Sequence, residues 1–332
     1  MTQRAAPMVE IHRGPFVESL HCGHAVLWDR SAGMVEAWGD PGAICLPRSA
    51  IKMIQALPLV ASGAADAAGL TLRHLALACA SHEGAPMHVG LVREWLADQE
   101  LDERALVCGP QMSRDRDLKL QMIRAGESGE RVHNNCSGKH VGFLTLARHL
   151  GADLDYCDPS HPVQVGVLEM FNALTDETSP GFGIDGCSAP NHAASIAGIA
   201  RAMAFFASAH KRDNKRSLGA ALLVKAMATH PELVAGKGRA CTLLMRAARE
   251  PLVVKTGAEG FFIAILPKRQ QGIALKIADG ATRASNCAIA ALLVRMGALE
   301  ADHPDVARFL KPEIRNWDGK VTGHMAPVAG LI

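Results

Sequence analysis

The sequence predicts an α+β protein in which strands near both ends of the chain form one largely antiparallel sheet. Three observations favour this fold. Short β-type runs occupy the first 45 residues, helical periodicity dominates the middle, and short apolar runs return from residue 251. Strands from both ends can join one sheet, with the helices as an inserted lobe or packed on its faces. We therefore expect residues 1–332 to form a single unit, with an α/β lobe from about 1–45 and 250–332 and a mainly helical lobe from about 46–249.

The first strands are predicted by three runs, MVEIH, FVESLHCGHAVLWD and GMVEAWG, at residues 8–12, 16–29 and 33–39. Arg-Gly-Pro and Ser-Ala-Gly separate these runs, and such tripeptides are typical of turns.

Helices are expected from residue 47 onward. Pro47 suits the first position of a helix that carries Ser49, and Pro58 is expected to end or kink that helix. Five further segments have helical periodicity and length: residues 86–99, 139–151, 161–175, 191–207 and 217–230.

The last part of the chain returns to strands. Residues 251–280 contain three short apolar runs with Gly and Pro-Lys breaks, which predict a hairpin or a three-stranded meander. A helix is expected over residues 282–299, and residues 316–327 are expected to add an edge strand.

Composition excludes several classes of protein. The chain is only 4% aromatic and its formal charge is +2, so a nucleic-acid-binding role is not expected. The N-terminal residues contain no apolar export segment, and the most membrane-like stretch, residues 193–209, contains Arg201 and is expected to be a buried helix. Nine scattered cysteines, an odd number, favour reduced thiols in the cytoplasm.

Ser49 and Lys52 are the first pair that suggests chemistry. Positions i and i+3 share a helix face, so the hydroxyl and the amine can meet. A serine hydroxyl needs a base to take its proton, and lysine serves only when it is neutral. Apolar neighbours and the start of a helix both disfavour the charged amine. The alternative is a lysine that extends to water beside a capping serine.

Lys255 strengthens the interpretation that Ser49 and Lys52 are a catalytic pair. It lies in Lys-Thr-Gly on an apolar run that is typical of a strand. Ser-x-x-Lys on a helix followed by Lys-Thr-Gly on a late strand is the layout of serine β-lactamases and penicillin-binding proteins. Without that layout, Lys255 would be a solvated strand end.

Ser81 and His82 emerge from a third segment, LALACASHEG, where an apolar run ends in a polar cluster suited to a cleft wall. The β-lactamase layout has Ser-Asp-Asn at this place, so Ser-His-Glu counts against a penicillin-recognising enzyme. Ser81 remains a partner for Lys255, whereas His82 alone is more often structural.

Cys136 and Cys187 lie in two polar turns that open helices, HNNCSGKHVGF and GIDGCSAPNH. Lys139 and His140 share a helix face with Cys136, and Asp185 precedes Cys187 by two residues. Two such cysteines can hold a thiophilic metal such as zinc, but no Cys-x-x-Cys pair is present. Spacing alone favours two buried free thiols.

Taken together, these segments resemble the class 3 L-asparaginases, also called the rhizobial-type or asparaginase II family. The matching stretches are PRSAIKMIQALPLV, LACASHEG, HNNCSGKHVGFL, GIDGCSAPNH and VVKTGAEGFF, and GKGRACT and NWDGKVTG also have the family's appearance.

The resemblance implies hydrolysis of L-asparagine to L-aspartate and ammonia, a fold similar to serine β-lactamases and glutaminases, and a homodimer. The family's two Ser-Lys pairs fall on Ser49 with Lys52 and on Ser81 with Lys255. Its zinc ligands fall on Cys136, Lys139 and Cys187, with water as the fourth. The expected substrate-binding residues are Arg48, near the α-carboxylate, and His82, Asn134, Asp185 and His140.

Three alternatives stay open: a glutaminase, a β-lactamase-like serine acyltransferase, and an inactive homologue that binds zinc.

Overall fold

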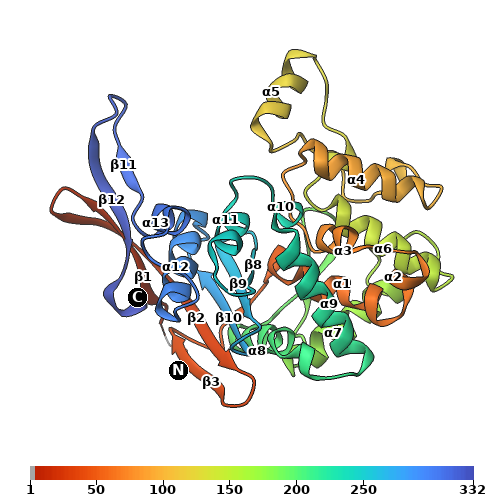
Figure 1. Ribbon diagram of the computed structural model, residues 1–332, viewed down its shortest axis with the longest axis horizontal. Helices are drawn as coiled ribbons and strands as arrows, with labels where there is room; N and C mark the ends of the chain where they lie inside the picture. The colour runs from red at the N-terminus through yellow and green to blue at the C-terminus, as the bar shows by residue number, and fades with distance from the viewer. Residues whose placement is uncertain (1–3) are drawn as a thin grey trace.

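The computed structural model describes residues 4–332, and it is shown in Figure 1. Residues 1–3 lie outside the described residues. They fall within the expected single unit and within the N-terminal segment that was expected to contain no export signal.

One eight-stranded, wholly antiparallel sheet dominates one side of the molecule. Its strands run in the spatial order β11-β12-β1-β2-β10-β9-β8, and β3 pairs with β2 beside this path. The strands are β1 Ala6–Arg13, β2 Phe16–Asp29, β3 Gly33–Trp38, β8 Val253–Thr256, β9 Phe261–Leu266, β10 Gln271–Ile277, β11 Glu313–Arg315 and β12 Val321–Pro327. The predicted α+β class, with a sheet built from both ends of the chain, is therefore confirmed.

Helices cover both faces of the centre of this sheet. Every residue of β9 is buried, so neither face of that strand meets water. Helix α8 (Ile196–Ala207) packs against β2, β9 and β10, and α12 (Thr282–Arg295) packs against β1, β9 and β10. Gly272 in β10 allows the approach of α8, because an added Cβ would come 2.3 Å from a backbone nitrogen of that helix.

The remaining helices form a second group beside the sheet, on the right of Figure 1. They pack mainly on one another around α1, and α5 projects from the top of the group. Their bounds are α1 Lys52–Ala61, α2 Ala64–Ala67, α3 Leu72–Ala78, α4 Pro86–Ala97, α5 Arg116–Arg124, α6 Ser137–His149, α7 Pro162–Thr175, α9 Lys215–Thr229 and α10 Pro231–Val234. Helices α11 (Ala240–Ala247) and α13 (Pro304–Leu310) lie nearer the sheet.

Short elements complete the fold. Five 3-10 helices are present among residues 4–332: η1 Arg48–Ile51, η2 Glu103–Ala105, η3 Arg131–His133, η4 Ala209–Lys211 and η5 Ala329–Leu331. Two small ribbons pair β4 (Ile44–Cys45) with β7 (Ala194–Ser195), and β5 (Phe182–Ile184) with β6 (Pro190–His192).

Three sequence predictions of local structure need correction. The helix expected over residues 191–207 begins only at Ile196, because the residues before it pair with β4 and β5. Pro47 lies before the first helical position, as the N-cap of η1, and α1 continues through Pro58 to Ala61. The tail forms a hairpin of β11 and β12, in which β12 pairs with β1 and β11 is the edge.

Within residues 4–332, none of the helices combines the length and the apolarity that a membrane crossing requires.

Candidate active site

A polar cavity of about 580 Å³ opens between the sheet and the helical group. This size is typical of small-molecule sites. Residues from nine separate segments line it: Arg48, Ser49, Ser81, Gln111, Arg114, Asn134, Asn135, Cys136, Asp185, Gly186, Cys187, Ala235, Gly238, Arg239, Ala240, Cys241, Thr256, Gly257, Ala258, Thr282, Asn286 and Phe309.

Ser49 lies in η1, at the junction of the two lobes. The residue before it, Arg48, has a φ of 54°, in the left-handed region that non-glycine residues seldom adopt. The Asn191 side chain holds this bend by accepting a hydrogen bond from the Arg48 N–H at 3.2 Å. Ser49 therefore faces the cavity from a constrained turn, and its hydroxyl has no hydrogen-bond partner among residues 4–332.

Gly257 brings strand β8 against this turn. An added Cβ at Gly257 would lie 2.5 Å from the carbonyl oxygen of Pro47, so only glycine permits the approach. The Lys-Thr-Gly segment thereby reaches the same wall of the cavity as Ser49.

Lys52 lies behind that wall and is 1% exposed. Its Nζ donates to the carbonyl oxygens of Ala80 and, at 3.4 Å, of Asn135, and it lies 3.1 Å from the Cys136 Sγ. Lys52 thus ties the loop that carries Ser81 to the loop that carries Cys136. Its amine makes these three contacts and no hydrogen bond to Ser49 in the described structure.

Ser81 and Lys255 are in direct contact. The Lys255 Nζ donates to the Ser81 Oγ at 2.8 Å and to the Thr256 carbonyl oxygen at 2.7 Å. The backbone of Ser81 is fixed by its own N–H, which donates to the Val234 carbonyl at 2.9 Å. Burial lowers the pKa of Lys255 to about 7, since Lys255 is 1% exposed and lies near Lys52. The amine of Lys255 is therefore able to take or give a proton near neutral pH.

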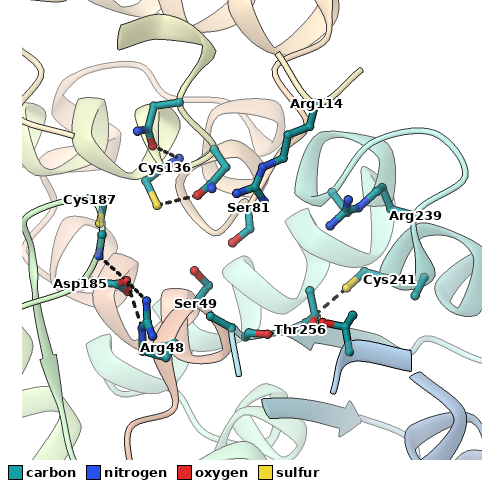
Figure 2. Close-up of a pocket in the computed structure, with 18 of the residues that line it drawn as sticks. Arg48, Ser49, Ser81, Arg114, Cys136, Asp185, Cys187, Arg239, Cys241 and Thr256 are labelled. Atoms are coloured by element: carbon teal, nitrogen blue, oxygen red, sulfur yellow. Dashed lines mark hydrogen bonds and ion pairs between the residues drawn. The ribbon is translucent and has the colours of Figure 1, made fainter. Parts of the chain in front are cut away.

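Arg48 and Asp185 form an ion pair on the opposite side of the cavity. The Nη2 of Arg48 lies 2.7 Å from the Asp185 Oδ1, and the Nε lies 3.1 Å from the same oxygen (Figure 2). The Asp185 carboxylate raises the pKa of Arg48, so the guanidinium stays charged. Its positive charge is compensated by the Asp185 carboxylate.

Cys136 and Cys187 lie together, with Lys139 beside them. The Lys139 Nζ is 3.1 Å from the Cys187 Sγ. The neighbouring Cys136 thiol and then Lys139 strongly lower the pKa of Cys187, whereas the Cys187 sulfur and burial raise the pKa of Cys136, whose Sγ also contacts the Asn135 Oδ1 at 2.9 Å. Burial opposes the charge on Lys139, but the neighbouring sulfurs outweigh it and raise the pKa of Lys139. Cys187 is therefore the thiol of the two that loses its proton more readily, beside the Lys139 amine.

His140 and His82 are fully buried behind the cavity. The His140 Nδ1 bonds to the Tyr156 hydroxyl at 2.9 Å, while its Nε2 is buried without a hydrogen-bond partner among residues 4–332. Burial lowers the pKa of His140 to about 4. The two nitrogens of His82 contact the Ser137 hydroxyl and the Gly84 N–H, so His82 supports the wall and does not face the cavity.

Asn134 lines the cavity and shapes the cysteine loop. Its Oδ1 accepts from the Cys136 N–H at 2.9 Å, and its Nδ2 donates to the Cys108 and Gly109 carbonyl oxygens. Asn134 therefore holds the backbone that presents Cys136.

A metal fits the donors at this place. The Lys139 Nζ lies 3.1 Å from the Cys187 Sγ, and this amine and the thiols of Cys136 and Cys187 are buried donors of the types that zinc accepts. Residues 4–332 contain no group of three or more His, Cys, Asp or Glu side chains placed to hold a metal ion. The expected set differs from such a group because its third protein ligand is a lysine.

Sequence reasoning missed several cavity residues, among them Gln111, Arg114, Arg239 and Cys241. The Gln111 Oε1 accepts from the Asn135 N–H, and the Cys241 Sγ accepts from the Thr256 N–H. The one available signal was the segment GKGRACT, which contains both Arg239 and Cys241.

Comparisons with known proteins agree on the family. The family model for L-asparaginase II matches residues 9–327. No curated protein sequence matches the chain.

Solved structures that match the chain have low sequence identity to it. A β-lactamase from Mycobacterium bovis is 13% identical, with a TM-score of 0.40, and the match covers 83% of this chain and 95% of that one. A protein named Mglu, in its native form, is 14% identical, with a TM-score of 0.49 and coverage of 85% and 66%. A class C β-lactamase from Rhodobacter sphaeroides is 15% identical, with a TM-score of 0.40 and coverage of 80% and 92%.

The family match spans nearly the whole chain and includes every segment that lines the cavity. This protein therefore belongs to the L-asparaginase II family and is an amidohydrolase of the asparaginase type.

Proposed function

We propose that this protein hydrolyses L-asparagine to L-aspartate and ammonia through a serine acyl-enzyme. One observation carries the proposal: the side chains of Ser49 and Ser81 open into the same cavity (Figure 2), and the buried lysines Lys52 and Lys255 lie behind its wall. A hydroxyl becomes a nucleophile when a nearby base takes its proton. The cavity thus contains two candidate nucleophiles and two candidate bases.

In the proposed first step, the Ser49 Oγ attacks the side-chain carboxamide carbon of asparagine, and Lys52 accepts the hydroxyl proton. For this transfer, Lys52 has to exchange one of its carbonyl contacts for Ser49, a rearrangement consistent with catalytic hydrogen bonds that form only with substrate bound. The Ser49 N–H has no backbone acceptor in the described structure, so it is free to stabilise the oxyanion.

Ser81 and Lys255 complete the turnover. Their 2.8 Å hydrogen bond supports a relay that gives a proton to the departing nitrogen as the carbon–nitrogen bond breaks. Water then attacks the β-acyl ester and gives a proton to the same pair, and the Ser49 Oγ leaves as Lys52 returns the proton that it took in the first step. The products are L-aspartate, ammonia and the free enzyme.

The roles of the two serines are tested by ammonia release and intact-protein mass spectrometry. Ser49→Ala and Lys52→Ala are each expected to lower kcat by about 10³-fold or more. A slow substrate analogue is expected to leave an acyl adduct on Ser49 in the wild type and in Ser81→Ala. An adduct on Ser81 instead would reverse the assignment, and near-wild-type ammonia release from Ser49→Ala would refute it.

We also propose a zinc ion held by Cys136, Lys139 and Cys187, with Arg48, His82, Asn134, Asp185 and His140 shaping the substrate site around it. The buried cluster of sulfurs and nitrogen supports this ligand set. When bound, zinc would polarise or orient a substrate oxygen. Lys139 has to lose its proton to coordinate, so binding is expected to release protons. Zinc content that is unchanged in the Cys136→Ser, Cys187→Ser double variant would exclude the site.

Substrate comparison separates the alternatives. Ammonia release from L-asparagine is expected to exceed that from L-glutamine. The reverse order would indicate a glutaminase, turnover of a chromogenic β-lactam without either amide would indicate an acyltransferase, and zinc binding without any acyl adduct would indicate an inactive homologue.

A further inference from the structure

Two arginines face the cavity without a partner. Arg114 and Arg239 both line it, and within residues 4–332 neither guanidinium donates a hydrogen bond or forms an ion pair. Figure 2 shows Arg114 entering from the helical side and Arg239 from the side of α11, both toward the space beside Ser81. Burial, and then the charge of Arg239, lower the pKa of Arg114, so the two cations share one environment.

The cavity contains no acid to neutralise these two charges. Asp185 is the only carboxylate among the residues that line it, and it is already paired with Arg48. Three guanidinium groups therefore face one carboxylate. Such an excess of positive charge in a concave site attracts anions, and a guanidinium binds a carboxylate through two parallel hydrogen bonds.

The positions of both arginines are fixed by one buried residue, Glu83. Its backbone carbonyl accepts hydrogen bonds from the N–H of Arg114 at 2.7 Å and of Asp115 at 3.1 Å. Its carboxylate accepts from the Lys237 N–H at 3.0 Å, two residues before Arg239. Glu83 is 7% exposed and forms no ion pair with either arginine within the described part of the chain.

Gly236 makes this arrangement possible. It has a φ of 126°, and an added Cβ would lie 2.1 Å from the Glu83 carboxyl carbon. The chain before Arg239 can therefore pass directly over the Glu83 carboxylate only because this residue is glycine. The two arginine-bearing loops are built as one unit rather than placed independently.

We propose that Arg114 and Arg239 together bind the α-carboxylate of the substrate and so restrict the enzyme to free amino acids with a side-chain amide. This inference rests on the proposed asparagine hydrolysis. It assigns the α-carboxylate to the two unpaired guanidiniums and not to Arg48, because Arg48 is already paired with Asp185. An asparagine whose α-carboxyl is esterified or joined in a peptide bond would offer them no negative charge.

The test compares L-asparagine with L-asparagine methyl ester, from which ammonia can come only from the side-chain amide. In Arg239→Gln and Arg114→Gln, KM for L-asparagine is expected to rise on the order of 10- to 100-fold, the range that the loss of a charged hydrogen bond implies. The kcat is expected to change much less, and initial rates on the ester should stay within a few-fold. The preference for L-asparagine over its methyl ester, expected of the wild type, would then be lost in both Gln variants.

Two controls separate carboxylate binding from structural damage. Arg239→Lys keeps the charge and is expected to keep most of the free-acid preference. Arg246→Gln removes an arginine from α11 that pairs with Glu232 outside the cavity, and it should leave both substrates unaffected. An unchanged KM for L-asparagine in both Gln variants, or an equal loss on acid and ester, would overturn the proposal.

Failure of the proposed function has a different signature. If the wild type releases no ammonia from L-asparagine, titration calorimetry with L-aspartate still tests the two arginines. Binding by the wild type that weakens in both Gln variants supports carboxylate binding, whereas equal binding, or none by the wild type, refutes it.

Discussion

Replacement of Lys255 by methionine is expected to stabilise the folded protein in a way that depends on pH. Lys255 is 1% exposed, and burial lowers its pKa from an ordinary value of 10.5 to about 7. In the unfolded chain the amine returns to water and to its ordinary pKa. The folded state therefore binds its proton less tightly than the unfolded state over the whole interval between these values.

The magnitude follows from that interval. The folded-state pKa lies below the unfolded one, so the protonated amine favours unfolding. This destabilisation is absent above about pH 10.5, grows as pH falls, and is complete below about pH 7. At about 1.4 kcal/mol for each pH unit, it amounts to about 4 kcal/mol at pH 7 and about 1 kcal/mol at pH 10. Methionine has a similar length and no proton to lose.

Urea unfolding of the wild type and of Lys255→Met across this range measures the effect. The variant is expected to gain about 3 kcal/mol relative to the wild type between about pH 10 and pH 7, with no further gain below. The lost hydrogen bonds to Ser81 and Thr256 lower the free energy of unfolding of the variant by a nearly constant amount, so they drop out of this difference.

The control is Lys268→Met, in which the replaced side chain is 73% exposed and pairs with Glu250 at the surface. The difference in free energy of unfolding between Lys268→Met and the wild type should stay nearly constant over the same pH range. A constant difference for Lys255→Met as well would refute the assignment of Lys255 as a buried amine that titrates near neutral pH.

Three further predictions concern the same cavity. Ammonia release is expected to fall as pH increases through about 7, because Lys255 must carry the proton that the relay gives to the departing nitrogen, and a flat kcat/KM profile from about pH 6 to pH 8 would contradict this. Gly257→Ala is expected to destabilise the protein by about 1–3 kcal/mol and to lower kcat, because its Cβ meets a backbone oxygen at 2.5 Å, whereas Gly90→Ala, which meets nothing within 4 Å, should be neutral or stabilising in thermal unfolding. Glu83→Ala is expected to raise KM about 10-fold, since the loop that carries Arg239 loses the carboxylate that anchors the Lys237 N–H, whereas the Arg114 loop keeps its bond to the backbone carbonyl of residue 83; an unchanged KM would argue against that role of the carboxylate.

Much of the fold could be predicted from local pattern. Alternating apolar residues in FVESLHCGHAVLWD and the meander after residue 251 predicted strands that the structure contains, at nearly the same bounds. The start of the helix at Ile196 could not be predicted this way. Ala193 and Ala194 are compatible with a helix that starts at residue 191, but pairing of residues 190–192 with β5 and of residues 194–195 with β4 determines the conformation.

In the candidate site, too, some contacts could be predicted from the sequence and others could not. Sequence reasoning placed Ser81 near Lys255, and the two are hydrogen-bonded. It also placed Ser49 beside Lys52 from their spacing, but the Lys52 amine instead contacts carbonyl oxygens of two other loops. A spacing rule describes neighbours on one helix and carries no information on acceptors that arrive from distant segments. Arg114 and Arg239 were missed for the same reason, since a single arginine in a loop has no local pattern.

The pairing of β2 with β10 has a consequence for synthesis of the chain. Gln271 of β10 lies opposite Asp29 of β2 and bonds to it across 242 residues of sequence. At about 5–20 residues per second, a ribosome needs roughly 10–50 s to make the partner after β2 has emerged. During that interval β1, β2 and β3 can pair, but the other edge of β2, with Ala25, Val26 and Leu27, stays open to other chains. Products that terminate anywhere between residues 39 and 270 keep this edge open permanently, so they are expected to aggregate or to be degraded rather than accumulate as separate folded lobes.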